Sequence, residues 1–525
     1  MSKPSPATID VVQYAFMSGA EQMRRNLYRS AHSPVIYEMK DCSVGIYDSN
    51  GDLLGQAPGL PFFLGSLGAT IQKVIKDQGE KEFLEGEIWI VNDSAICGSH
   101  LNDVTVFMPI FSENRLLGFS GTKAHWNDVG AKDAGYVSDS TSIFQEGLRI
   151  PVMRIASKNG LDQQLSSLLS LNSRFPKALI GDLQAQIAAC RTGHDRFLSI
   201  IDRYGVETVL ECIQIFFAQS EVDDRKSVSL IPDGIYQASG HLDSNGLNET
   251  DPVFVSVRVE VSGENMTVDL EGSSSESRGS INSGIVQTIS AIQMAFKFIV
   301  NPELPATGGN FRNLNIKVPA GTCFDPSPEA ACLHYGPHLM LAIDLIVKAL
   351  SPAVPERTAA GHVGDSWNIV FVNDDHSPRY LSGESLVGGW GAWEGSHGES
   401  AVIHSAAGDF KNAPVETMEH RYPLMIERNA LRIGSGGKGK WNGGDGIERF
   451  YITQQPCYLS LFFERTKLPS WGLFGGTSGK PPKVTVITPD GVSKDILIIN
   501  ALRVDAGTRV EVRTGGGGGW GVKDS

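Results

Sequence analysis

The sequence predicts a mixed α+β protein built in several layers. Three observations predict this class. Two pairs of strand-like runs in the first 130 residues are each joined by a short polar break, which indicates antiparallel hairpins. Helical periodicity dominates residues 9–30 and 161–220. Beyond about residue 230 the chain is rich in strand-like runs and glycine, with apolar helical patterns at 285–300 and 339–350 that indicate buried helices.

The length of 525 residues suffices for two or three domains or for one large multilayer body. We expect a first region, residues 1–228, that contains the hairpins and the helices. We expect a second, β-rich region, residues 229–525, with buried helices and a glycine-rich C-terminus. Neither an internal repeat nor a long low-complexity linker marks the division, so the expected boundary is soft.

Composition and charge exclude several classes of protein. The net charge of −14 and the absence of a basic block argue against nucleic acid as a partner. The seven cysteines are odd in number and lack C-x-x-C spacing, which is typical of a reducing cytoplasm and argues against a disulfide framework. No signal pattern opens the chain, and no apolar run approaches the ~18 residues of a membrane span. We therefore expect a cytoplasmic protein without a membrane partner.

The first elements are a helix and a hairpin. A helix is predicted over residues 9–30, with an apolar face formed by Val12, Phe16, Met23 and Leu27. A strand-like run from Tyr37 to Asp48 then enters an Asp/Asn/Gly turn and continues as residues 53–56, which predicts a hairpin.

A second hairpin brings chemically active side chains together. Two extended runs flank the polar break Ser112-Glu-Asn-Arg115. With the turn centred in this break, residues whose numbers sum to about 227 face each other. Asp103 then lies opposite Ala124, with His125 next to it, and His100 lies in the loop just before. Two imidazoles and one carboxylate are thus expected at one end of the hairpin.

This set of side chains suits a divalent metal. Zinc, manganese and iron accept histidine nitrogen and aspartate oxygen, and three protein ligands leave a position open for water or substrate. The alternative is that each histidine is an ordinary hydrogen-bonded loop residue, which is the commoner role of a lone histidine. Because three ligand types converge, we favour the metal site.

Three segments around this hairpin resemble one protein family. They read NDSAICGSHLNDVTVFMPIF, GTKAHWNDVG and STSIFQEGLRIPV. They are similar to the ND-x-x-x-GG-x-H-x-x-D-V/I-T, A-H-H-A-D-V-G and I-x-x-EGLRIPP patterns of the hydantoinase B/oxoprolinase family. Members are metal-containing subunits of ATP-dependent amide hydrolases and of acetone- and acetophenone-type carboxylases.

The resemblance runs from about residue 8 to the C-terminus and has specific implications. It implies that His100, Asp103 and His125 hold one divalent metal, with zinc preferred and manganese or iron as alternatives. Trp126 stands where members often carry a second histidine, which argues that position 126 is not an essential ligand.

Further candidate site residues come from other similar segments. Asp41 lies in a segment similar to the family's E-x-x-D-F-S-x-x-x-x-D-x-x-G, and is a candidate metal ligand or proton acceptor. Its alternative role is that of a hydrogen-bonded carboxylate at a strand edge. Asp128 is a second candidate proton acceptor. Arg174, in a segment resembling the family's ANSR, is a candidate for an anionic substrate or phosphate, although an ion pair is the commoner role. His404 is a further candidate substrate contact, whereas His397 is expected to be a loop residue.

Two motifs predict what the chain lacks, and one predicts turns. The run GSGGKGKW, residues 434–441, nearly matches the phosphate-binding G-x-x-x-x-G-K-[ST], but Trp441 replaces the Mg²⁺-binding hydroxyl. We therefore expect no nucleotide site here. No G-x-S-x-G occurs, which argues against a serine hydrolase of the nucleophile-elbow type. The glycines of residues 515–521 are expected to form tight turns rather than an anion site.

The resemblance leads to a first hypothesis and two alternatives. The first is the metal-containing subunit of an ATP-dependent hydrolase of cyclic amides, of hydantoin, lactam or oxoproline type. A hydantoinase A-type partner would bind ATP and Mg²⁺ and phosphorylate the amide oxygen, in a hetero-oligomer with two or more copies of each subunit. The alternatives are a subunit of an acetone- or acetophenone-type carboxylase, and a non-catalytic scaffold subunit.

Overall fold

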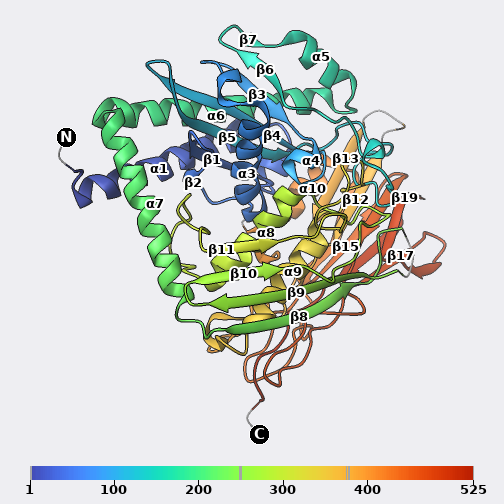
Figure 1. Ribbon diagram of the computed structural model, residues 1–525. Helices are drawn as coiled ribbons and strands as arrows, with labels where there is room; N and C mark the ends of the chain where they lie inside the picture. The colour runs from blue at the N-terminus through green and yellow to red at the C-terminus, as the bar shows by residue number, and fades with distance from the viewer. Residues whose placement is uncertain (1–2, 248–250, 374, 376–378, 409, 524–525) are drawn as a thin grey trace.

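The computed structural model describes residues 3–247, 251–373, 375, 379–408 and 410–523. Helices make up 31% of the chain and strands 26%, and the strands fall into four sheets among the described residues. The predicted α+β class is therefore confirmed (Figure 1). Within the described residues, we find no helix with the length and apolar character that crossing a membrane requires.

The first sheet is antiparallel and carries the candidate site. Its strand order is β2-β1-β5-β4-β3-β6-β7. The strands are β1 (Cys42–Asp48), β2 (Leu53–Gln56), β3 (Ile88–Val91), β4 (Asp103–Ser112), β5 (Arg115–His125), β6 (Met153–Ser157) and β7 (Gly160–Leu161). Even-numbered residues of β4, such as Val104 and Val106, pack against helix α6 (Pro176–Tyr204). Odd-numbered ones, such as Phe107, pack against helix α3 (Pro61–Gln78), so helices cover both faces (Figure 1).

The β4–β5 hairpin has its turn where the sequence predicts it but differs in register. Glu113 and Asn114 form the turn, with positive φ angles of 51° and 64°. The register shifts between Ile110 and Phe111, because Leu117 is an extra residue on β5. Asp103 therefore pairs with His125, and the predicted pairing of Asp103 with Ala124 is wrong.

The bulge has a direct consequence for the site. Residues that pair across a strand point to the same face of the sheet, and a shift of one residue moves a side chain to the opposite face. With the predicted register, Asp103 and His125 would point to opposite faces. With the observed register, they share the face that α3 covers. The bulge is thus what brings these two side chains together.

The helices of the first region match the predicted segments. Helix α1 is Pro6–Ser30, and the predicted 161–220 region contains α5 (Gln163–Leu171), α6 and α7 (Val206–Val228). The predicted strand from Tyr37 is wrong in its first five residues. The short helix α2 (Pro34–Tyr37) ends there, Lys40 has a φ of 66°, and β1 begins only at Cys42.

The second region is β-rich, with helices packed against its sheets. One sheet has the order β11-β10-β9-β8, a second β13-β12-β16-β19, and a third β14-β15-β20-β17-β18. The strands are β8 (Gly234–Leu242), β9 (Val253–Ser262), β10 (Asn265–Asp269), β11 (Leu314–Lys317), β12 (Asn368–Asn373), β13 (Tyr380–Ser385), β14 (Leu424–Leu431), β15 (Ile447–Thr453), β16 (Cys457–Phe462), β17 (Lys483–Ile487), β18 (Ser493–Asp495), β19 (Ile498–Val504) and β20 (Arg509–Arg513).

The two predicted helices of this region are both present and mostly buried. Helix α8 (Ile285–Ile299) packs against α3, and α9 (Gly336–Leu350) packs against α8, β8 and β9. Two short helices, α4 (Ser94–Cys97) and α10 (Val415–Arg421), complete the set of α-helices among the described residues. Buried apolar residues of both regions belong to one hydrophobic cluster, and the division at residue 228 stays a prediction.

Glycines 515–519 of the C-terminal run do not form turns, so the prediction is wrong for them, whereas Gly521 has a φ of 71° and lies in a bend. None of the glycines 515–519 has a positive φ; instead, they run extended among other glycine-rich segments. Gly517 N donates to Gly444 O at 3.0 Å, Gly518 N to Gly361 O at 2.9 Å and Gly519 N to Thr477 O at 2.9 Å. A Cβ atom added at these three glycines would lie 1.8–2.4 Å from backbone oxygens of neighbouring segments. Glycine is therefore required because backbones touch.

Candidate metal centre

Three side chains converge at the ends of two central strands of the first sheet. Asp103 begins β4, His125 ends β5, and His100 lies in the loop between α4 and β4. One ligand atom from each lies within 4.8 Å of the others. His100 Nε2 and His125 Nδ1 lie 2.8 and 3.1 Å from Asp103 Oδ1. The three residues are buried, with 5%, 0% and 8% of their surface exposed for His100, Asp103 and His125.

The donor set fits a divalent cation. Two ring nitrogens and a carboxylate oxygen are the ligands that zinc and its neighbours accept. Two further buried oxygens, Asp103 Oδ2 and Asp41 Oδ1, have no hydrogen-bond partner among the described residues. Such atoms are costly to bury unless something binds them. Asp41 joins the site from the start of β1, where its backbone oxygen accepts from His125 N at 3.1 Å.

Electrostatics within the cluster favour a charged carboxylate. Burial opposes ionisation of Asp103, but His100 and His125 hold its pKa well below the usual value. Burial lowers the pKa of His100, but the Asp103 carboxylate outweighs burial and raises that pKa overall. Burial raises the pKa of Asp41 to about 6, partly countered by His125. A proton on Asp41 is therefore held more tightly than on an exposed carboxyl group.

His100 is oriented by a loop that lies 233 residues further along the sequence. Its Nδ1 donates to Leu333 O at 2.9 Å, which leaves Nε2 free for a metal. The loop is held in turn by Glu146, whose carboxylate accepts from Cys332 N at 3.1 Å and Leu333 N at 2.9 Å. Glu146 belongs to the EGLRIP segment, and this contact gives that segment a physical role at the site.

Asn92 ties the same segment to the loop that carries His100. Its Nδ2 donates to Leu101 O at 2.7 Å and to Leu148 O at 3.0 Å. Its Oδ1 accepts from Ile150 N at 2.6 Å. The segments around residues 92–105 and 146–150 are therefore braced by one buried amide, which fixes where His100 and Asp103 begin.

Trp126 points away from the candidate ligands. It follows His125, so it lies on the opposite face of the strand end, and it is buried among residues of α6. Its Nε1 donates to Gln186 Oε1 at 2.9 Å. Gln186 Nε2 donates back to the strand at Val104 O at 2.9 Å. In this position the indole joins α6 to the hairpin.

Asp128 and Arg174, two of the candidate residues, form a pair. Arg174 Nη1 donates to Asp128 Oδ1 at 2.9 Å, and Arg174 N donates to Asp128 Oδ2 at 2.5 Å. Ser173 Oγ donates to Asp128 Oδ2 at 3.2 Å. Both carboxylate oxygens of Asp128 are thus already used, and the guanidinium of Arg174 also donates to Ala131 O at 2.9 Å.

His404 lies elsewhere, in a second buried polar cluster. It is fully buried, and its Nε2 lies 3.1 Å from Asp344 Oδ1 on α9. Its Nδ1 accepts from Ala406 N at 3.1 Å. His397 is an exposed loop residue whose Nδ1 accepts from Asn442 N at 2.8 Å. Both His404 ring nitrogens are used within the protein.

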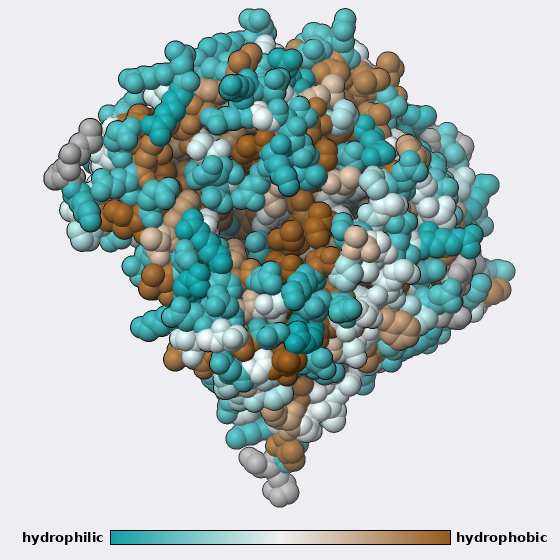
Figure 2. Space-filling view, viewed as in Figure 1, coloured by the Kyte–Doolittle hydropathy of each residue, from teal (hydrophilic) through white to brown (hydrophobic). Residues whose placement is uncertain are grey.

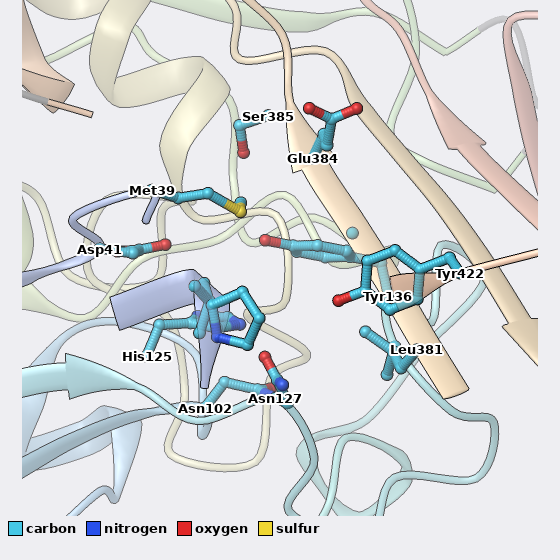
Figure 3. Close-up of a pocket in the computed structure, with 14 residues that line it drawn as sticks. Met39, Asp41, Asn102, His125, Asn127, Tyr136, Leu381, Glu384, Ser385 and Tyr422 are labelled. Carbon is cyan, nitrogen blue, oxygen red and sulfur yellow. The ribbon is translucent and has the colours of Figure 1, made fainter. Parts of the chain in front are cut away.

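Two small cavities meet at the candidate metal centre. One, of about 30 Å³, is lined by Asp41, His125 and Tyr136 together with residues of β13 and Tyr422 (Figure 3). The other, of about 70 Å³, is mostly apolar. Its lining includes His100, Asp103, Asp41, Phe62, Phe63, Tyr136, His334, Tyr335, Met340, Ile403 and Phe410. A volume of this order holds a few water molecules.

The face of the molecule seen in Figure 1 carries both apolar and hydrophilic side chains. The space-filling view shows apolar side chains gathered in a hollow near the middle of the face, with hydrophilic residues around them (Figure 2).

Several of the cavity-lining residues were not predicted. Tyr136 lines both cavities, and its ring lies 6.2 Å from that of His125 and 6.3 Å from that of His100. Tyr335 contacts His100 edge-on, with ring centroids 4.9 Å apart. The one signal in the sequence was the pair of histidines in the run HYGPH, residues 334–338, between predicted elements. Nothing local placed that run beside the hairpin.

The fold and this buried site identify the class of protein. The chain belongs to the hydantoinase B/oxoprolinase family, which it matches over residues 5–523. The resemblance of the sequence motifs to that family is therefore confirmed.

One relative and two solved structures are similar to this chain over most of its length. A putative D-/L-hydantoinase subunit from a Pseudomonas species is 30% identical, over 91% of this chain and 83% of that protein. The crystal structure of an ATP-dependent caprolactamase from Pseudomonas jessenii superposes with a TM-score of 0.90 at 26% identity, over 99% of this chain and 92% of that one. A nucleotide-free acetone carboxylase superposes with the same TM-score of 0.90 at 19% identity, over 98% of this chain and 76% of that one, which shows a common fold.

Proposed function

We propose that the chain is the metal-containing subunit of an ATP-dependent hydrolase of cyclic amides. The observation that carries this proposal is the buried cluster of His100, Asp103 and His125 at the wall of a cavity. The likeness to a hydantoinase subunit and to an ATP-dependent caprolactamase supports the substrate class.

The proposal assigns ATP to a partner subunit of hydantoinase A type. In this chain the near-match to a phosphate-binding loop lies among the hydrogen-bonded glycine segments, where Trp441 N donates to Trp520 O at 3.0 Å. No helix follows it, because β15 is the next element. A phosphate loop needs a helix N-terminus behind it. The partner would transfer a phosphoryl group to the amide oxygen and so make the ring carbon electrophilic.

Each residue of the centre has a proposed role. His100, Asp103 and His125 would hold one divalent metal, with zinc preferred and manganese or iron as alternatives. When bound, such a metal lowers the pKa of a water molecule and supplies a nucleophile at neutral pH. Asp41, whose Oδ1 lacks a partner among the described residues, would accept the proton of that water. We prefer Asp41 to Asp128 for this step, because both oxygens of Asp128 already accept hydrogen bonds from Arg174.

The apolar lining supports the same chemistry. Phe62, Phe63 and Met340 limit the water that reaches the cavity. Exclusion of bulk water protects an activated amide from stray hydrolysis and strengthens the electrostatic contacts of the polar groups.

Metal content tests the assignment of the ligands. The purified chain should hold about one divalent ion, and His100→Ala or His125→Ala should remove it, because a two-ligand site is far weaker. His397→Ala, at an exposed loop, is the matched control and should keep the ion. Elemental analysis that finds the full metal content in both ligand variants would refute the assignment.

Isotope transfer tests the reaction. A lactam labelled with ¹⁸O at its carbonyl should pass the label into inorganic phosphate, and only with both subunits and ATP present. Both oxygens of the new carboxylate then come from water. Label that stays in the carboxylate, with none in phosphate, would refute attack of water at a phosphorylated amide carbon.

The structural likeness to an acetone carboxylase keeps one alternative open. A ketone carboxylase subunit would use the same centre for an enolate. ATP turnover that depends on bicarbonate and a ketone, and not on lactams or hydantoins, would favour this alternative. A scaffold subunit would bind no metal, and the metal analysis separates it from both.

A further inference from the structure

We propose that His334 is a substrate-contacting residue, whose Nε2–H donates a hydrogen bond to the ring nitrogen of the activated amide. The inference rests on the proposed function for the identity of the substrate. The position of the His334 imidazole, its surroundings and its tautomer are the observations that support the inference.

His334 lines the same cavity as the candidate metal ligands. It is 2% exposed, and the cavity of about 70 Å³ is bounded by His334 together with His100 and Asp103. Its ring lies 6.0 Å from that of Tyr136, which in turn lies 6.2 Å from that of His125. His334 also follows Leu333, whose backbone oxygen orients His100. One short segment therefore serves both the metal ligand and the cavity wall.

The imidazole is held rigidly. It stacks on Phe462, with ring centroids 3.6 Å apart and planes inclined by 15°. Its backbone N donates to Ser280 O at 3.0 Å, and its Nδ1 lies 2.8 Å from Ser280 Oγ. Two bonds to one serine and a stacked ring leave the side chain little freedom. A preorganised donor of this kind is what stabilises charge that develops in a transition state.

The Nε2 atom is buried and has no hydrogen-bond partner among the described residues. A buried polar atom without a partner is unfavourable, and such atoms gather at functional sites. Here the free atom belongs to a residue that lines the cavity, and a ligand in the cavity is the partner that we assign to it. Because the atom has almost no accessible surface, a neighbouring side chain of the cavity wall must move for the ligand to reach it.

The hydrogen bond to Ser280 assigns the tautomer. Ser280 is fully buried, and within the part of the chain that the structure describes its hydroxyl bonds to His334 Nδ1 alone. If Nδ1 carried the proton, the hydroxyl proton would have no acceptor. If the hydroxyl donates to Nδ1, the serine is satisfied and Nε2 carries the proton. Burial, together with the charge on His100, lowers the pKa of His334 to about 3, so the ring is neutral at physiological pH.

A donor at this position suits the proposed substrate. Phosphorylation of the amide oxygen leaves the ring nitrogen with a lone pair and no proton. Attack of water on the carbon moves electron density onto this nitrogen, so a hydrogen bond from Nε2–H strengthens as the reaction proceeds. The attacking water adds to the carbon, the bond from the carbon to the ring nitrogen then breaks, and the nitrogen takes the protons that it needs from water. The acyl phosphate that remains is hydrolysed by a second water at the carbon, which releases phosphate. His334 keeps its proton throughout.

A second serine–histidine pair provides a matched control. His338 Nε2 lies 3.0 Å from Ser283 Oγ, and its Nδ1 likewise has no partner among the described residues. His338 is fully buried, and burial lowers its pKa to about 3 as well. It differs in one respect, because His334 lines the cavity and His338 does not.

The kinetic test compares asparagine and glutamine variants in the assembled enzyme. Asparagine at 334 keeps an acceptor for Ser280 and removes the donor to the cavity, whereas glutamine places an amide N–H near the position of Nε2. We expect His334→Asn to lower kcat about 100-fold with little change in KM, and His334→Gln to recover about tenfold of that loss. His338→Asn should stay within about twofold of wild type.

Metal content and nuclear magnetic resonance supply readouts independent of turnover. His334→Asn should hold as much metal as wild type. In chain labelled with ¹⁵N-histidine, the signals lost in His334→Asn should show the proton on Nε2. The cyclic imidate 2-methoxy-1-pyrroline, whose ring nitrogen has a lone pair and no proton like that of the activated amide, should shift that Nε2 signal. The inference is overturned by unchanged kcat in His334→Asn, by an equal loss in His338→Asn, by loss of metal from His334→Asn, or by a proton on Nδ1.

Failure of the proposed function is separately visible. If the wild-type assembly hydrolyses no cyclic amide, the proposed function fails. The tautomer and the response of Nε2 to 2-methoxy-1-pyrroline then test His334 alone, and the absence of a shift counts against the inference.

Discussion

Replacing Glu146 by glutamine should weaken metal binding from a position that does not touch the metal. The carboxylate accepts from Cys332 N, Leu333 N and Ser140 Oγ, at 3.1, 2.9 and 2.7 Å. Glutamine keeps one acceptor oxygen and turns its amide N–H₂ towards a donor. Burial raises the pKa of Glu146 to about 7, so above that pH the loop loses one charge-assisted hydrogen bond, worth about 1.5–3 kcal/mol.

The effect on the metal follows through Leu333. Its backbone oxygen fixes the ring of His100, and loss of such a contact behind a ligand lowers metal affinity about 10–100-fold. We expect Glu146→Gln to raise the metal dissociation constant by that factor, measured by competition with a chelator. The metal-free chain should also unfold at a lower denaturant concentration, because its free energy of unfolding falls by the energy of the lost bond.

Glu464 is the matched control. It too is fully buried and accepts from a backbone N–H and a hydroxyl, of Asp243 at 2.5 Å and Ser244 at 2.9 Å. Glu464→Gln should reduce stability by a similar amount and leave metal affinity unchanged. Unaltered metal affinity in Glu146→Gln, or an equal loss in both variants, would refute the link through the 332–333 loop.

Three further predictions concern stability and nucleotide binding. Burial raises the pKa of Asp48 to about 6, so the folded state holds this proton more tightly than the unfolded chain, and stability falls as pH rises from about 4 to 6. Asp48→Asn removes this dependence on pH. The free energy of unfolding of the variant, relative to that of wild type, should therefore rise by up to about 3 kcal/mol between pH 4 and pH 7. A difference that does not change with pH would contradict this. Gly517→Ala puts a Cβ 1.9 Å from Trp390 O and should destabilise the fold by about 3 kcal/mol or more in denaturant unfolding, whereas Gly336→Ala, which meets one atom at 3.7 Å, should not; equal stability of both variants would refute the close-approach argument. Lys440→Met should leave the affinity of the assembly for ATP unchanged in calorimetry, and ATP binding by the isolated chain that this change abolishes would overturn the assignment of ATP to the partner.

The sequence predicted those parts of the site that lie close together along the chain. His100, Asp103 and His125 fall within one hairpin, so alternation and turn position suffice to bring them to one end. The register was wrong by one residue because Leu117, the extra residue of the bulge, was not foreseen, although Gly118 beside it is an isolated strand glycine of the kind that can mark a bulge. The resemblance to the family motifs was not affected by this error, because a motif identifies residues whichever face of the strand they lie on.

Contacts between distant segments could not be predicted in the same way. The 332–334 loop reaches the hairpin from more than 200 residues away along the chain, as the bond between His100 and Leu333 shows. Its position depends on Glu146 and on the packing of α8 and α9, which periodicity does not encode. The glycines of the C-terminal run were predicted as turns because glycine signals a positive φ and a close approach equally well.

The glycine segments also set an order of events during synthesis. Glycines 515–519 hydrogen-bond to segments near residues 361, 389, 437, 444 and 473, all of which leave the ribosome earlier. Those segments have no partner for these bonds until glycines 515–519 have emerged, so the second region cannot close before that point. All strands of the first sheet and α6 have been made by residue 204, so their hydrogen bonds to one another do not wait for the glycines. A nascent chain should therefore carry a folded first sheet and an open second region, exposed to chaperones and proteases until the final glycines are added.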